Sequence, residues 1–236
     1  MKYYHGSLSP MGFKKWRFIS EKNNIASIKS SSLSGYYRDG FITHHSALFF
    51  TTDREYALKS SKDNKAIFAS FKYSKDETSL KRLDLINIDR NIADKYRKYL
   101  LTNANKWLPE LIDIRGICPH IENVDDWIKA WDDGTAFKIG ADPKYPVGRY
   151  IGRLLNDCQS GDKNAHLELL HYQRLLIEIL VIAARNMGYQ VLECRERNTT
   201  DVKENGNIVK VRPAASDILV ILDKRIIKKE VVWEKL

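Results

Sequence analysis

The chain has 236 residues, of which 43% are hydrophobic and 29% are charged. This length fits one large or two small domains, and this composition excludes wholesale disorder and collagen-like or coiled-coil architectures. The 39 lysines and arginines outnumber the 30 acidic residues, giving a formal net charge of +9. Such a surplus favours anionic partners, whether nucleic acid, phosphorylated cofactors or acidic proteins.

The sequence predicts a soluble protein of the cytoplasm that does not bind membranes. The three cysteines are far apart and form no CxxC pair, which argues against a disulfide framework and a structural zinc site. No stretch approaches the roughly 18 consecutive apolar residues of a membrane span. The N-terminal sequence MKYYHGSLSPMG also lacks the apolar core of a secretory signal.

The first third of the chain predicts the beginning of a sheet. Strands are expected over three runs, 46–50, 66–73 and 80–88. Thr51, Thr52 and Asp53 follow the first run and are typical caps for a helix over 54–61. The preceding Ser- and Gly-rich run 27–35 predicts a loop.

Helical spacing then dominates, and strands return near the end. The region 90–160 is predicted to be a helical insert, and residues 166–187 a largely buried helix with Gly188 as its left-handed cap. Four β-like runs follow at 189–196, 207–213, 216–222 and 225–233, divided by polar turns and by Pro213. Strands at both ends with helices between them predict an α+β domain whose first and last strands meet.

Several common catalytic motifs are absent from the sequence. There is no GxGxxG, GxxxxGK[ST] or GxSxG, which removes the common dinucleotide, P-loop and α/β-hydrolase folds. No histidine stands in an HExxH arrangement or at ligand spacing from a cysteine, so no metal site is predicted. A metal-dependent nuclease would need an Asp and a Glu-x-Lys on neighbouring strands, and Glu193-Cys194-Arg195 matches that pattern only distantly.

Three motifs together resemble a known family. YYHGS at 3–7, LFFTTDREYA at 48–57, and GYQVLE followed by SDILVILDKRIIKK in the last 50 residues look like the ADP-ribosyltransferase fold of the His-Tyr-Glu class. Poly(ADP-ribose) polymerases, diphtheria-type toxins and rifampin-modifying enzymes share that fold. The resemblance covers about residues 1–75 and 188–233. It implies one domain over 1–236 with a split β-sheet core, in which 90–160 is a large helical insertion.

The resemblance assigns the first motif to binding NAD, the co-substrate. Tyr4, His5, Gly6 and Ser7 would line the NAD site, with His5 hydrogen-bonded to ribose hydroxyls. The backbone of Gly6 would pair with the nicotinamide carboxamide, because glycine permits close approach and its amide and carbonyl complement a carboxamide. Ser7 stands where the family usually has Thr or Ser.

The second motif supplies aromatic rings. Phe49 replaces the family's tyrosine, which keeps a ring to stack on nicotinamide but removes a hydroxyl. Thr51 takes the position of the family's Thr or Ser. Tyr56 in the following helix is the second candidate for the nicotinamide face. The structural alternative is that Phe49 and Phe50 both belong to the core.

The third motif supplies a carboxylate. The family normally has a glutamate on a late strand, and this sequence has Asp217, as rifampin-modifying members have Asp; Asp223 and Glu193 are the alternatives. Breaking the bond between nicotinamide and ribose develops positive charge, which a preplaced carboxylate stabilises. The resemblance therefore implies the catalytic residues His5, Phe49 and Asp217 and requires no metal.

The implied activity is that of an NAD-dependent ADP-ribosyltransferase, a glycosyltransferase acting on a macromolecule. Residues 1–38 carry seven basic residues against one glutamate and are rich in aromatic residues. A second basic cluster comprises Arg195, Arg197, Lys203, Lys210 and Arg212. Cations interleaved with rings suit phosphates and bases, so RNA or DNA is the first expected acceptor and protein the second.

Intracellular transferases of this kind are often bacterial or phage toxins, defence proteins or injected effectors. The resemblance therefore implies a toxin role and leaves room for an antitoxin partner. The competing interpretation is a non-catalytic nucleic-acid-binding module in which His5, Phe49 and Asp217 are ordinary structural residues.

Overall fold

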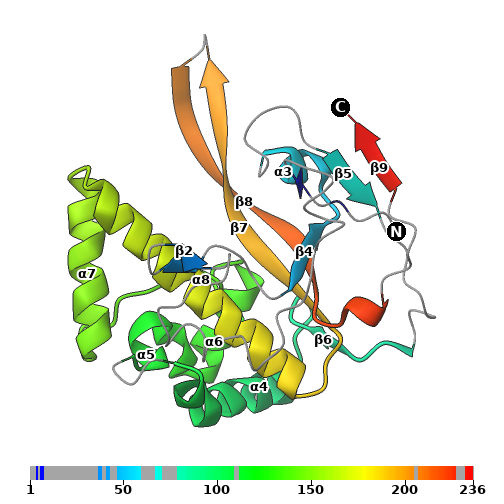
Figure 1. Ribbon diagram of the computed structural model, residues 1–236, viewed down its shortest axis with the longest axis horizontal. Coiled ribbons are helices and arrows are strands. Elements are labelled where there is room, and N and C mark those ends of the chain that lie inside the picture. Colours follow the sequence, from blue (N-terminus) through cyan, green and yellow to red (C-terminus); the bar gives the residue numbers. More distant parts are fainter. Residues whose placement is uncertain are drawn as a thin grey trace.

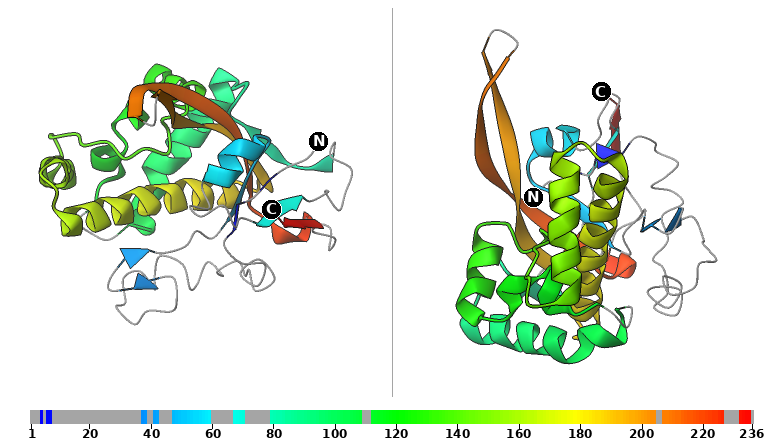
Figure 2. Two further views of the ribbon diagram at one scale, coloured as in Figure 1. Left: turned by 90° about the horizontal axis from the view of Figure 1, so that it is seen from above. Right: turned by 90° about the vertical axis from the view of Figure 1, so that its left-hand side faces the viewer.

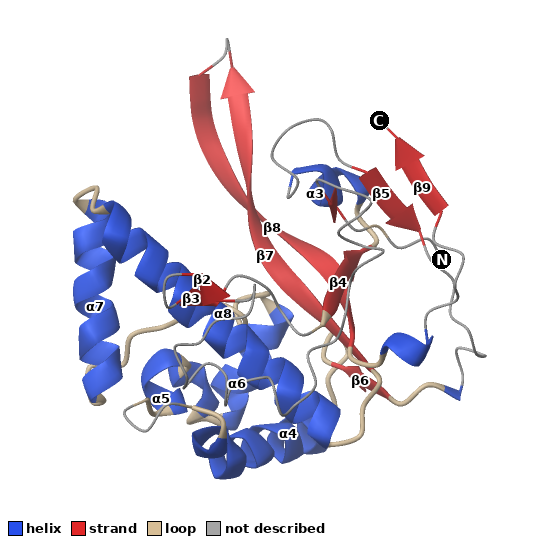
Figure 3. Cartoon of the chain, viewed as in Figure 1, coloured by secondary structure: helices blue, strands red, loops and turns tan. Residues whose placement is uncertain are grey.

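The structure, a computed structural model, shows a mixed α/β chain compatible with the α+β prediction (Figure 1). It describes residues 4, 6–7, 37–38, 41–42, 47–59, 67–70, 79–108, 112–204, 207–226 and 232–235. His5 and the loop predicted over 27–35 lie outside these residues. The helices α4 to α8 gather on one side of the largest sheet (Figure 3).

This main sheet has four strands in the order β4-β8-β7-β6. β4 (Leu48–Thr51) pairs antiparallel with β8 (Asn207–Ile221), which pairs antiparallel with β7 (Val191–Glu204). β6 (Arg82–Asp84) runs parallel to β7 at the far edge. β7 and β8 continue beyond their neighbours as a two-stranded ribbon that projects clear of the helices (Figure 2).

A second sheet has three strands in the order β1-β5-β9. β1 (Gly6–Ser7) and β9 (Val232–Lys235) pair on either side of β5 (Ile67–Ser70). The first and last strands therefore lie in one sheet, as the alternation of strands and helices predicts. A further short antiparallel pair, β2 (Tyr37–Arg38) with β3 (Phe41–Ile42), comes near α8.

Helices occupy most of the sequence between β6 and β7, which confirms the helical spacing predicted over 90–160. They are α4 (Arg90–Asn103), α5 (Ile114–Ile117), α6 (Val124–Asp132), α7 (Pro146–Gln159) and α8 (Lys163–Asn186), and α3 (Arg54–Lys59) follows β4. Short 3₁₀ helices cover Ala104–Lys106 and Pro119–Ile121. Asp89, Asn123 and Asp162 cap α4, α6 and α8 by accepting backbone N–H groups.

α8 forms the middle of the core. It begins three residues before the predicted start because the Asp162 side chain accepts from the backbone N–H groups of Asn164 and Ala165. Its second half is buried nearly all round, as its composition predicts. Gly188 adopts a φ of 84°, a left-handed conformation that glycine reaches without strain, so the predicted cap is confirmed.

The two faces of the main sheet bury different side chains, because successive residues of a strand point to opposite faces. The face called here the helix face carries Leu192, Cys194, Ile218 and Val220, which belong to the same core as α8. The face called here the outer face carries Phe50, Val191, Leu219 and Ile221, which form a smaller core with Ile226.

Two predictions in the last third of the chain are wrong. The polar run 198–206 was expected to be a turn and Pro213 a strand break, but β7 and β8 stay paired from Val191 to Glu204, with Thr199 opposite Pro213. β8 pairs with β4 only at Ile218–Ile221, so around Pro213 it is an edge strand. A proline is tolerated on an edge strand, because its missing N–H can face away from the partner.

The prediction of a strand over 225–233 is also wrong for its first two residues. A 3₁₀ helix covers Lys224–Ile226, and β9 begins at Val232. The Asp223 carboxylate accepts hydrogen bonds from the backbone N–H and the guanidinium of Arg225, which turns the chain. Asp84 ends β6 early in the same way, by accepting from the backbone N–H groups of Ile86 and Asn87.

Candidate functional site

Thr51, the last residue of β4, lies where the three sequence motifs come together. Its backbone exchanges two hydrogen bonds with Tyr4 of the first motif, N–H to O distances of 2.7 and 2.9 Å. Its hydroxyl donates to the backbone carbonyl of Asp217 in the third motif, 3.0 Å away. His5 lies outside the described residues, but its neighbours are placed, Tyr4 against Thr51 and Gly6 opposite Phe68.

The turn from β4 into α3 is tied to β8. The Thr51 hydroxyl oxygen accepts from the backbone N–H of Asp53, and the Asp53 carboxylate accepts from the backbone N–H of Tyr56 at the start of α3. This confirms the predicted cap. The Ser216 hydroxyl donates to the second oxygen of Asp53 at 3.4 Å. Residues 51–56 are thus held against Ser216 and Asp217, which come just before the part of β8 that pairs with β4.

Tyr56 reaches across to β7. Its hydroxyl donates a hydrogen bond of 2.8 Å to Oε2 of Glu196, which lies opposite Ser216 in the register of β7 and β8. Sequence reasoning missed Glu196 and identified Asp53 only as a helix cap. The signal for Glu196 was its place in the predicted run 189–196, where alternation puts it on the face of Leu192 and Cys194.

Phe49 lies partly buried on the helix face. It is opposite Val220 in the register of β4 and β8, and its ring meets Phe137 edge to face with centroids 6.1 Å apart. Phe137 in turn contacts Trp131 of α6, with centroids 5.3 Å apart. Phe50 points the other way and is 1% exposed. Phe50 is therefore a core residue, and Phe49 joins the sheet to the helices.

The Asp217 carboxylate lies on the outer face. Asp217 is opposite Arg195 in the register, and the Arg195 Nε atom lies 3.4 Å from its Oδ1 atom. Arg195 also forms a 2.7 Å ion pair with Asp132 at the end of α6. The structure thus brings the backbone of Asp217 to Thr51, but it places the Asp217 carboxylate and the Phe49 ring on opposite faces of the sheet.

The two alternative carboxylates lie elsewhere. Asp223 follows the far end of β8, where hydrogen bonds from Arg225 lower the pKa of its carboxyl. Glu193 forms a 2.7 Å ion pair with Arg82 of β6. Within the described residues, no three His, Cys, Asp or Glu side chains group closely enough to hold a metal ion. The placement of Glu193 therefore does not support the nuclease interpretation.

The buried cysteines are not nucleophiles. Burial raises the pKa of the Cys194 thiol well above its usual value, and the neighbouring Glu196, Asp217 and Glu193 charges add to the effect. Burial likewise raises the pKa of Cys118. All three cysteines of the chain are free. A protonated, enclosed thiol does not react, so neither Cys118 nor Cys194 is a candidate nucleophile.

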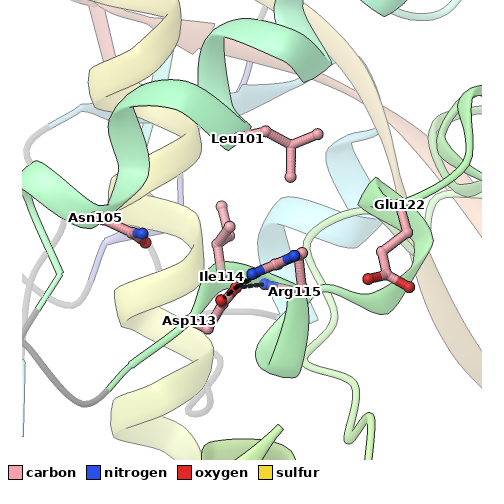
Figure 4. Close-up of a pocket in the computed structure, with 6 residues that line it drawn as sticks. All are labelled: Leu101, Asn105, Asp113, Ile114, Arg115 and Glu122. Atoms are coloured by element: carbon pink, nitrogen blue, oxygen red, sulfur yellow. Dashed lines mark hydrogen bonds and ion pairs between the residues drawn. The ribbon is translucent and has the colours of Figure 1, made fainter. Parts of the chain in front are cut away.

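A separate cavity of about 380 Å³ opens among the helices (Figure 4). Arg115 points into it, already paired with Asp113 at 2.5 Å and stacked on the Tyr145 ring. That pairing lowers the pKa of the Asp113 carboxyl. The described residues lining the cavity are Leu101, Asn105, Asp113, Ile114, Arg115 and Glu122. None of them belongs to the three motifs.

No helix in the described part of the chain is both long and apolar enough to cross a membrane. Comparisons of the chain with family models, with curated proteins and with solved structures found no match.

Proposed function

We propose that this protein is an NAD-dependent ADP-ribosyltransferase built on the split β-sheet core of that fold. The observation that carries the proposal is the meeting of the three motifs at Thr51. Tyr4, Thr51 and Asp217 are far apart in the sequence but are joined by hydrogen bonds of 2.7 to 3.0 Å. These bonds use the backbones of Tyr4 and Asp217, and they bring together segments that are distant in sequence, which a shared ligand site requires.

The groups near Thr51 suit the chemistry of NAD. The backbone of Gly6, in the strand that Tyr4 precedes, can complement a carboxamide, and the rings of Phe49 and Tyr56 can stack on nicotinamide. The carboxylates at the base of the β7–β8 ribbon can stabilise the positive charge that develops on the ribose. Nicotinamide leaves as a neutral molecule, so the bond can break without a metal ion.

The proposed acceptor is nucleic acid. The protein has a formal net charge of +9, and the β7–β8 ribbon extends from the site into open space (Figure 2). The sequence of the ribbon includes Lys203, Lys210 and Arg212 beside Asp201 and Glu204. A projecting ribbon on a protein of positive net charge suits contact with a phosphate backbone more than recognition of a small molecule.

Label transfer tests the proposal. Purified protein is incubated with NAD labelled in its adenylate phosphate and, separately, with RNA, DNA and lysate protein, alongside the His5→Ala variant. We expect label on RNA or DNA that is lost in His5→Ala. Label on protein alone would mean that the acceptor is a protein and not a nucleic acid. No transfer and no nicotinamide release would contradict the enzymatic activity and favour a non-catalytic binding module.

A further inference from the structure

We infer that Glu196 of β7 supplies the catalytic carboxylate of this site. The inference rests on the proposed function and changes which residue carries the central charge. The motif resemblance implies Asp217 on β8, whereas three features of the structure favour Glu196: its face of the sheet, its surroundings and its contact with Tyr56.

The first feature is the face of the sheet. β7 and β8 pair without irregularity from Val191 to Asp201, with Glu196 opposite Ser216 and Arg195 opposite Asp217. Opposite residues of an antiparallel pair share a face, and neighbours along a strand do not. Glu196 therefore lies on the helix face. Asp217 lies on the outer face.

The aromatic side chains of the site lie with Glu196. Phe49 is opposite Val220 of the helix face, and Phe49 and Tyr56 both pack against the core on that side. A nicotinamide ring stacked on either of them would place its ribose on the same side of the sheet. Glu196 is on that side, and its Oε2 atom accepts a hydrogen bond from one of these rings, the phenol of Tyr56.

The second feature is the charge around each carboxylate. Asp217 faces the Arg195 guanidinium at 3.4 Å, and 52% of its side chain is exposed. Within the described residues, no Lys, Arg or His pairs with Glu196, and its hydrogen-bond partner is the neutral Tyr56 hydroxyl. A carboxylate without a cation beside it presents its full negative charge to a developing oxocarbenium, whereas a paired carboxylate presents less.

The third feature is orientation. The Tyr56 hydroxyl donates to Oε2 of Glu196 at 2.8 Å, which leaves the other oxygen of the carboxylate to face the ribose. The backbone N–H of Tyr56 donates to the Asp53 carboxylate, whose other oxygen accepts from the Ser216 hydroxyl. A preorganised charge costs no reorganisation when the reaction occurs, which is the condition for electrostatic stabilisation of a transition state.

The proposed step is balanced without a further reactant. The bond from the ribose C1′ atom to the nicotinamide nitrogen breaks, and both electrons leave with nicotinamide, which becomes neutral. A lone pair of the acceptor then forms the new bond to C1′, and the acceptor's proton passes to water. Glu196 keeps its negative charge throughout and stabilises the positively charged ribose between these events.

The test measures nicotinamide release from NAD by the wild type and by Glu196→Gln, Glu196→Asp and Asp217→Asn. Glutamine keeps an acceptor for the Tyr56 hydroxyl but removes the charge, so thermal unfolding should change little. The matched control is Glu168→Gln, because Glu168 accepts a 2.6 Å hydrogen bond from Tyr150 among the helices and thus loses the same charge from the same kind of pair.

We expect Glu196→Gln to lower the rate roughly 100-fold, Glu196→Asp to lower it less, Asp217→Asn to lower it less than Glu196→Gln, and Glu168→Gln to leave it unchanged. The assignment of Glu196 would be overturned if Glu196→Gln released nicotinamide at the wild-type rate, or if Glu196→Asp were no faster than Glu196→Gln. Either result would leave the proposed transferase activity standing. A wild type that releases no nicotinamide would overturn both.

Discussion

Tyr4 and Thr51 exchange two backbone hydrogen bonds, of 2.7 and 2.9 Å, and so join the strand of the first motif to the edge of the main sheet. Thr51 is 4% exposed, and its hydroxyl serves two backbone groups at once, the N–H of Asp53 and the carbonyl of Asp217. This residue therefore holds together the segments that carry the proposed site.

Replacing Thr51 by valine should destabilise the protein. Valine keeps the shape and the β-branch but loses the hydrogen bonds to the Asp53 N–H and the Asp217 carbonyl, and a hydrogen bond of this kind contributes about 0.5–1.5 kcal/mol. Urea unfolding should show this loss in Thr51→Val and a smaller one in Thr51→Ser, which keeps the hydroxyl. Equal stability of Thr51→Val and the wild type would mean that the hydroxyl holds nothing in place.

Removing the Tyr56 hydroxyl should slow the proposed reaction. Tyr56→Phe keeps the ring but frees the Glu196 carboxylate, and losing a hydrogen bond to a charged group corresponds to roughly a tenfold change in rate. Nicotinamide release measures the effect. Tyr150→Phe is the control, because it removes the same kind of bond to Glu168. An equal effect of the two substitutions would contradict a specific role for Tyr56.

Phe137 should couple the helices to the sheet. It is 3% exposed and its ring lies between Phe49 and Trp131. Phe137→Ala should lower the free energy of unfolding by about 3–5 kcal/mol, and Phe137→Leu by less, because a smaller cavity remains. Tryptophan fluorescence and far-UV circular dichroism should report one shared transition. Separate transitions would mean that the helices and the sheet unfold independently.

Stability should fall in mild acid partly because of His171. Burial, assisted by Arg174, lowers the pKa of His171 to about 4 from 6.5. Below pH 6.5 His171 therefore binds a proton in the unfolded chain but stays neutral in the folded protein. The free energy of unfolding falls until the pH reaches about 4. The pKa shift corresponds to about 3 kcal/mol.

Replacing His171 by glutamine should remove that part of the pH dependence. Urea unfolding at neutral pH and in mild acid measures it for both proteins. His120, whose pKa is also lowered by burial, leaves a residual dependence in the variant. If the wild type and His171→Gln lose the same stability on acidification, the account of His171 is wrong.

Local patterns predicted much of the fold. The helical spacing over 90–160, the cap at Asp53 and the left-handed Gly188 were all predictable, because each depends on residues close together in the sequence. The continuous β7–β8 ribbon was not. Its polar composition resembles a turn, and Pro213 is tolerated only because β8 is an edge strand there, which depends on how far β4 extends.

The site was predictable only in part for the same reason. Motif order indicated Thr51 and the neighbourhood of Asp217, but the direction of a side chain depends on register, and register is set by pairing across long stretches of sequence. Neighbouring residues of a strand point to opposite faces, so a register shift of one residue would move a side chain to the other face. In the register observed, the Asp217 carboxylate and the Phe49 ring lie on opposite faces. The pairing of Tyr56 with Glu196, 140 residues apart, carries no local signal.

The most direct test of the account is release of nicotinamide from NAD by the purified full chain, followed by chromatography with and without added RNA or DNA. The account predicts release that nucleic acid accelerates and that His5→Ala abolishes while the protein remains folded. A folded wild type that leaves NAD intact under every one of these conditions would contradict it.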